Sequence, residues 1–256
     1  MKSTLAACAL VFLGSSSAAS AAEQKPLRFT NVATSQKHGR KLTGRFLQIT
    51  GASCARLWKR LALLSIRART DNIRTDIHPD PFYKTYSSTE TGSFCHRGKG
   101  AAGYYGAETS DCDAPLTLVN ATFAWIAENL ADSIDFVIWT GDSARHDNDE
   151  EIPRTEEQVL GQNRMLVNKF KEVFGSDGGD RRSPSAFKIP IVPTFGNNDI
   201  LPHNIMVKGP NRWTRNYEDV WHDIVPEAQR HAFDRGGWFF VEVIPNKLAV
   251  ISLNTM

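Results

Sequence analysis

Short apolar runs alternate along the chain with segments in which apolar residues recur every three or four positions. The runs typical of buried strands are 45–50, 136–140, 189–195, 238–244 and 248–253. The helical spacing predicts helices over 116–130 and 155–174, and a further helix within 213–231. Strands that alternate with helices are typical of a layered α/β domain, and no internal repeat is visible.

Local signals support some of these boundaries. Thr155-Glu156-Glu157-Gln158 resembles a capping box, and Gly175 follows Phe174 as a helix C-cap would. Prolines within 189–195 favour an irregular or edge strand. The long segment 78–113 is rich in Pro, Gly, Ser and Tyr, and loops of this length are usually functional or pinned by a disulfide.

The first 22 residues resemble a secretory leader, with a positive residue, a short apolar stretch and small residues before Ala21. The apolar stretch is too short to span a bilayer stably, and the alternative is a weak uncleaved anchor. We therefore expect the secretory pathway, and residues 23–44 read as a polar lead-in. Asn120-Ala121-Thr122 is a glycosylation acceptor, which is a weak signal when it stands alone.

Cysteine usage agrees with export. Cys8 lies in the leader and Cys54 lies in the anomalous segment 51–75, which leaves Cys95 and Cys112 as an isolated pair around a glycine-rich stretch and predicts a disulfide. The alternative is a Cys/His metal site that uses His96, although four regularly spaced ligands are missing.

Residues 51–75 differ from their surroundings. They carry six cations and one carboxylate, a net charge of +5 in a chain of formal charge +2. The basicity of the chain is therefore local, and it indicates neither a nucleic-acid partner nor membrane contact beyond an N-terminal anchor. Because this segment separates the strand 45–50 from the residues expected at its end, we interpret it as a non-native insertion such as a translated intron. The alternative is a genuine basic helical insertion.

Three short polar strings follow predicted strands: Asp76-Ile77-His78, Gly141-Asp142 and Gly196-Asn197-Asn198-Asp199. Side chains at the carboxyl ends of successive parallel strands converge on one edge of a sheet. Carboxylate, imidazole and amide groups suit divalent cations. Asp76 and His78 project in the same direction and can share one cation.

The same strings predict a site for two divalent cations that clamp a phosphoryl group. Asp142 is the expected bridging carboxylate, Asn197 an amide ligand, and His146 the proton donor outside the metal shell. Each string also has an interpretation that is purely structural and involves no metal. His78 can be a loop histidine, Gly141-Asp142 a turn, and the Asn-Asn-Asp string a helix N-cap. His146 and Asp147 can be a solvated pair.

The longer strings DIHPDPFYK, CHRG, YYGAETSDCD, WTGDSARHD and FGNNDILPHN resemble fungal endopolyphosphatases of the calcineurin-like metallophosphoesterase superfamily. The resemblance runs from about residue 45 to residue 256, without 51–75. It implies a four-layer α/ββ/α sandwich, of which 45–256 would be the incomplete, N-terminal part. It also implies cleavage within inorganic polyphosphate, two divalent metal ions (Mn, Mg, Zn or Co) and residence in the vacuole lumen, the alternative being secretion.

Carried over by position, Asp76, His78, Asp142 and Asn197 resemble metal ligands, and His146 resembles the catalytic histidine of sphingomyelinase-like relatives. Many relatives have histidine where this chain has Asn198, which can hydrogen-bond a phosphate oxygen but cannot donate a proton as imidazolium would. We expect the insertion to loosen Asp76 and His78. The family's later histidine ligands do not follow, so we expect no tight binding of two metals, which a calorimetric titration with two tight cations would refute.

The sequence therefore favours a metal-dependent endopolyphosphatase that hydrolyses phosphoanhydride bonds. Two alternatives stay open. A sphingomyelinase-like phosphodiesterase would act on a lipid head group or a nucleotide instead of polyphosphate. An inactive fragment that lacks the later metal ligands would expose apolar sheet edges and aggregate.

Overall fold

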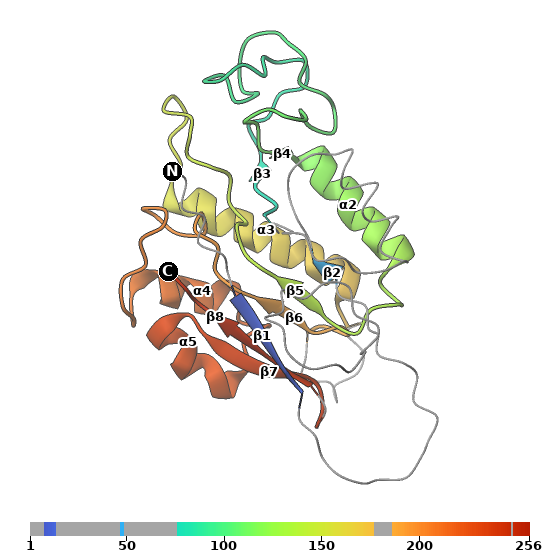
Figure 1. Cartoon of the computed structure of the whole chain (residues 1–256), viewed down its shortest axis with the longest axis vertical. Coiled ribbons are helices and arrows are strands. Elements are labelled where there is room, and N and C mark those ends of the chain that lie inside the picture. Colours follow the sequence, from blue (N-terminus) through green and yellow to red (C-terminus); the bar gives the residue numbers. More distant parts are fainter. Residues whose placement is uncertain (1–7, 14–46, 49–75, 177–185, 247) are drawn as a thin grey trace, which may run out of the picture.

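The computed structural model describes residues 8–13, 47–48, 76–176, 186–246 and 248–256. Within them, a parallel sheet is formed by β2 (Leu47–Gln48), β5 (Val137–Trp139) and β6 (Ile191–Pro193), in the order β2-β5-β6. The three strands predicted upstream of the polar strings thus lie side by side (Figure 1). β6 is at an end of this described sheet, as its prolines predicted.

A second, antiparallel sheet has the order β1-β8-β7 and consists of β1 (Cys8–Leu13), β8 (Leu248–Leu253) and β7 (Phe239–Ile244). Side chains at the sheet ends join it to the parallel sheet. Thr194 Oγ1 donates to the carbonyl of Leu253 at 2.9 Å, and Ser252 Oγ donates to that of Pro193 at 2.7 Å. β1 lies inside the segment expected to be a leader or anchor, and that expectation stays a prediction.

Helices cover the sheets. The helices are α2 (Leu116–Asn129), α3 (Glu156–Phe174), α4 (Arg212–Val220) and α5 (Arg230–Gly236), with a 3-10 turn η1 (Glu227–Gln229) before α5. Thr155 caps α3 by accepting a hydrogen bond from the Gln158 amide, and Gly175 ends it. α3 packs against both α2 and α4. The predicted helices are therefore confirmed.

The core contains a chain of aromatic rings. Trp139 of β5 lies 5.1 Å from the Phe170 ring of α3 and 5.9 Å from Trp221, between ring centroids. Phe195, two residues after β6, lies 4.9 Å from Trp221 between ring centroids. These fully or nearly fully buried rings anchor the loops that follow β5 and β6, which carry the candidate site.

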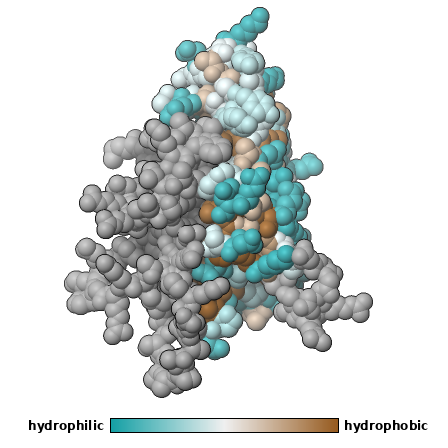
Figure 2. Space-filling model, turned by 90° about the vertical axis from the view of Figure 1, so that its right-hand side faces the viewer, coloured by the Kyte–Doolittle hydropathy of each residue, from teal (hydrophilic) through white to brown (hydrophobic). Residues whose placement is uncertain are grey.

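Residues 81–113, here called the disulfide loop, connect the short parallel strands β3 (Pro79–Asp80) and β4 (Ala114–Pro115). Cys95 and Cys112 are joined by a disulfide, which confirms the prediction. The loop forms a lobe at one end of the molecule (Figure 1). At that end the visible surface is mostly hydrophilic or intermediate in hydropathy, whereas apolar patches lie lower on this face (Figure 2).

The polar lead-in 23–44 and the segment 51–75 both lie wholly outside the described residues. In the described part of the chain, no helix combines the length and the apolar character that a membrane span requires.

Candidate metal centre and proton donor

The turns that follow β5 and β6 touch each other through two glycines. Gly141 has a positive φ of 84°, and a Cβ at this position would overlap the Gly196 amide nitrogen. A Cβ on Gly196 would in turn overlap the amide nitrogen of Asp142. Only glycine allows this close backbone approach, so the two Gly-polar strings act as one structural unit.

Asp199 links the two turns by accepting hydrogen bonds from both. Its Oδ2 accepts hydrogen bonds from the amides of Asp142 (2.9 Å) and Gly196 (2.8 Å). Its Oδ1 accepts from the Ser143 amide at 2.8 Å and from Asn163 Nδ2 at 3.1 Å. Complete burial and the charge of Asp142 raise the pKa of Asp199 to about 7, and the N–H donors oppose this rise. The sequence pattern did not assign Asp199 a role.

Three predicted ligands meet at this edge. One ligand atom each from Asp76, His78 and Asp142 lies within 4.8 Å of the others. His78 Nδ1 lies 2.8 Å from the carbonyl of Ala144, which fixes a proton on Nδ1 and leaves Nε2 free to bind a metal. His78 Nε2 is 3.8 Å from Asp142 Oδ2. The residues thus fit a divalent cation, and Asp76 and His78 lie beside Asp142 even though 51–75 precede them.

The backbone at two of these ligands is unusual. His78 has φ of 40° and Asp142 has φ of 51°, a left-handed region that non-glycine residues seldom adopt. The amide of His78 donates to the carbonyl of Asp142 at 3.1 Å, so each turn holds the other. Such conformations cluster at functional sites, where surrounding contacts maintain them.

Asn198 contributes its backbone to the site. Its amide donates to Asp142 Oδ1 at 2.8 Å, which orients the carboxylate. The buried guanidinium of Arg154 donates to the carbonyl of Asn198 at 2.8 Å and lies 3.4 Å from its Oδ1. Asn197 precedes this contact, and its role as a metal ligand stays a prediction, as does a direct role of the Asn198 side chain.

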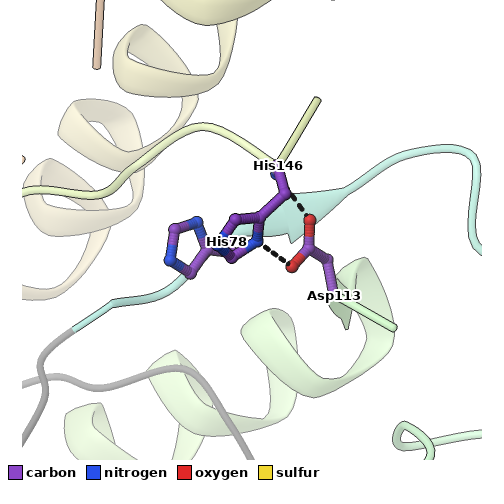
Figure 3. Close-up of side chains that lie close together, drawn as sticks. All are labelled: His78, Asp113 and His146. Carbon is purple, nitrogen blue, oxygen red and sulfur yellow. Dashed lines mark hydrogen bonds and ion pairs between the residues drawn. The ribbon is translucent and has the colours of Figure 1, made fainter. Parts of the chain in front are cut away.

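His146 lies next to the candidate metal ligand His78. Its ring lies 4.0 Å from the ring of His78, between centroids. Asp113 Oδ1 lies 2.7 Å from His146 Nδ1, and Asp113 Oδ2 accepts from the His146 amide at 2.6 Å (Figure 3). Asp113 is therefore hydrogen-bonded to both the ring and the backbone amide of His146. Sequence reasoning missed Asp113, although it ends the quoted string YYGAETSDCD.

The Asp113–His146 pair is electrostatically matched. Burial lowers the pKa of His146, but the hydrogen bond and charge of Asp113 outweigh this, so the net shift is upward. Burial likewise raises the pKa of Asp113, and the hydrogen bond and charge of His146 bring it below its ordinary value.

His78, Asp113 and His146 form a second group with metal-ligand atoms within 4.8 Å of one another. Because Asp113 is already bonded to His146, the group with Asp76 and Asp142 fits a metal better.

A second polar network lies beside His146. His96 Nε2 is 2.7 Å from Asp80 Oδ2, and His96 Nδ1 is 2.5 Å from Asp149 Oδ2. Arg97 also donates to Asp149. Burial raises the pKa of Asp149, but the hydrogen bonds from Arg97 and His96 hold it at about 2. With Asp113 and His146, the residues Asp80, His96 and Asp149 line a small hollow that opens to solvent.

No protein-family model matches the chain. Individual proteins do. An endopolyphosphatase of Neurospora crassa is 61% identical over 182 residues, which are 71% of this chain and 24% of that protein. The endopolyphosphatase of Saccharomyces cerevisiae is 41% identical over 238 residues (91% of this chain, 31% of the relative). That of Cryptococcus neoformans is 38% identical over 296 residues (99% of this chain, 38% of the relative).

The chain thus spans between 24% and 38% of the length of these three relatives. The shared part covers between 71% and 99% of the chain itself. By sequence, the chain is therefore homologous to the fungal endopolyphosphatases along most of its own length.

Proposed function

We propose that this chain supplies metal-binding and proton-donating residues for the hydrolysis of phosphoanhydride bonds within inorganic polyphosphate. The observation that carries the proposal is the contact of His146 with His78, beside Asp76 and Asp142. This arrangement puts a proton donor next to ligand groups suited to a divalent cation. The endopolyphosphatase name of the homologues supplies the substrate class.

Asp76, His78 and Asp142 would hold the cation, and we propose Asn197 as a further ligand. A divalent cation there supplies Lewis-acid stabilisation of the charge that develops on a phosphoryl group. A second cation, as the resemblance implies, stays a prediction, and Asp142 would be the ligand shared with it. The hydrogen bonds to Asp142 Oδ1 and His78 Nδ1 orient both ligand groups before any cation arrives.

His146 would deliver a proton to the leaving phosphate oxygen. Asp113 keeps a proton on His146 Nδ1, so the partly exposed imidazole can present Nε2 to the substrate. The raised pKa of His146 favours the protonated form that a general acid needs. The Asn198 side chain, next to the backbone that orients Asp142, would donate a hydrogen bond to a phosphate oxygen.

Two finer features belong to the same proposal. The mixed α/β arrangement is compatible with part of the four-layer α/ββ/α sandwich of metallophosphoesterases. The disulfide is compatible with an oxidising compartment, and we propose the secretory pathway with the vacuole lumen as destination.

The test is the length of the products made from long-chain polyphosphate in the presence of Mn²⁺. We expect fragments of intermediate length before orthophosphate accumulates, and no cleavage after chelation of the metal or after Asp142→Asn. Release of orthophosphate alone, or equal cleavage by the Asp142→Asn chain, would contradict the proposal. Stronger competition from a choline phosphodiester than from polyphosphate would instead favour the sphingomyelinase-like alternative.

A further inference from the structure

Each cysteine of the disulfide is followed by a residue whose side chain is hydrogen-bonded to the loop that carries His146. Cys95 is followed by His96, and Cys112 is followed by Asp113. Residues 143–152, here called the His146 loop, are held by these two residues at separate points. Asp113 binds His146, and His96 binds Asp149, three residues further on.

These contacts close a ring. It runs from Cys95 to His96, across to Asp149, back along the His146 loop to His146, across to Asp113 and through Cys112 to Cys95. Cys95, His96 and Asp149 are buried, whereas Cys112, Asp113 and His146 are partly exposed. The hollow beside His146 is lined by members of the same ring (Figure 3 shows its His146–Asp113 side).

The ring is attached to the rest of the fold on both sides. Asp113 directly precedes β4, whose Ala114 amide donates to the carbonyl of His78 at 3.0 Å. His96 also contacts Asp80 of β3, and β3 pairs with β4. The carboxylate that grips His146 is therefore fixed between a disulfide on one side and a strand that reaches a candidate metal ligand on the other.

We propose that the Cys95–Cys112 disulfide and His96 are positioning elements for His146, and that they act together by closing this ring. The proton-donating role of His146 rests on the proposed function; the mechanical coupling does not. A ring opened at either the disulfide or the contacts of His96 and Arg97 with Asp149 frees Asp113 to move, and the orientation of His146 is lost. Because one opening suffices, a second opening adds little.

The test measures the hydrogen exchange of the His146 backbone amide, which donates to Asp113, in the full chain. Cys95→Ala with Cys112→Ala opens the ring covalently, and His96→Ala with Arg97→Ala opens it at the other contact, because Arg97 also donates to Asp149. We expect each change to speed the exchange about tenfold, the order of one lost hydrogen bond, and the combination to speed it about tenfold as well. An effect of about a hundredfold in the combination would mean independent contributions and would overturn the proposal.

A spectroscopic signature separates positioning from general loosening. In chains with ¹⁵N-labelled histidine, the His146 Nδ1–H signal should be lost in the ring-opened variants, whereas the Nδ1–H of His78, bound to Ala144, should remain. Tyr83→Phe is the matched control, because it removes a hydrogen bond of the disulfide loop to Gly103 outside the ring. It should leave both signals intact.

If the double cysteine variant does not fold, the chain with His96→Ala and Arg97→Ala decides, because it keeps the disulfide and loses both contacts with Asp149. Loss of the His146 signal with retention of the His78 signal supports the proposal, and retention of both overturns it. Neither readout depends on catalysis. A chain that fails to cleave polyphosphate but shows this coupling would contradict the proposed function and would still support the positioning of His146 by the ring.

Discussion

Replacement of His146 with glutamine is expected to lower the rate of metal-dependent hydrolysis by about 10²–10⁴-fold, the usual contribution of a positioned general acid. Glutamine keeps a side chain of similar reach but cannot deliver a proton as imidazolium does. Because His146 is not among the ligands that fit the metal, its loss should leave cation affinity nearly unchanged. The measurement is the initial rate at saturating Mn²⁺, with His222→Gln as a control at an exposed histidine.

The pH dependence follows from the pKa shifts of the pair. The pKa of His146 is raised from 6.5, so its stabilising effect is present below 6.5 and is lost as pH rises through the folded-state value. The pKa of Asp113 is lowered from 3.8, so its effect is present above 3.8 and is lost as pH falls through the folded-state value. Wild-type activity should also fall at alkaline pH, because His146 then loses the proton that it would donate.

Two results of the His146→Gln experiment would contradict the proposed role of His146. One is a decrease in rate of less than tenfold, and the other is a decrease in rate accompanied by a loss of cation affinity.

The Asp199→Asn variant is expected to lower the free energy of unfolding by at least about 3 kcal/mol, because buried amides lose their acceptor. An asparagine keeps one oxygen but turns an NH₂ group toward two of the N–H donors. The turns after β5 and β6 would then separate, although Asp199 is not among the candidate metal ligands of the described residues. Urea unfolding at constant m-value measures the effect.

Asp223→Asn is the matched control for that substitution. Asp223 forms an ion pair with Lys171 at 2.6 Å, with both side chains 39% exposed. Exposed pairs contribute at most about 1 kcal/mol, so this variant should remain close to the wild type. Equal losses for Asp199→Asn and Asp223→Asn would show that Asp199 does not fasten the two turns.

The sequence was most informative where a local pattern carries the structural cause. Thr155 and Gly175 mark the ends of α3 because capping is decided within a few residues. The proximity of Asp76, His78 and Asp142 could be predicted because side chains after parallel strands share one edge of the sheet. The disulfide was found because two cysteines bracket one loop.

What the sequence did not reveal depends on contacts between distant segments. Asp113 lies 33 residues from His146, and nothing in the spacing indicates that contact. Asp199 reads locally as part of a helix N-cap, yet its donors come from the turns after β5 and β6 and from α3. His96 and Asp149 are likewise brought together by the path of the disulfide loop.

The most direct test of the metal site is a calorimetric titration of Mn²⁺ into the chain and into its Asp142→Asn variant. We expect saturable binding to the wild-type chain and an affinity weaker by at least about a hundredfold in the variant, since loss of a metal ligand should weaken metal affinity at least as much as loss of a contact that supports a ligand. Absence of binding to the wild-type chain, or equal affinity in the two chains, would contradict a metal centre built on Asp76, His78 and Asp142.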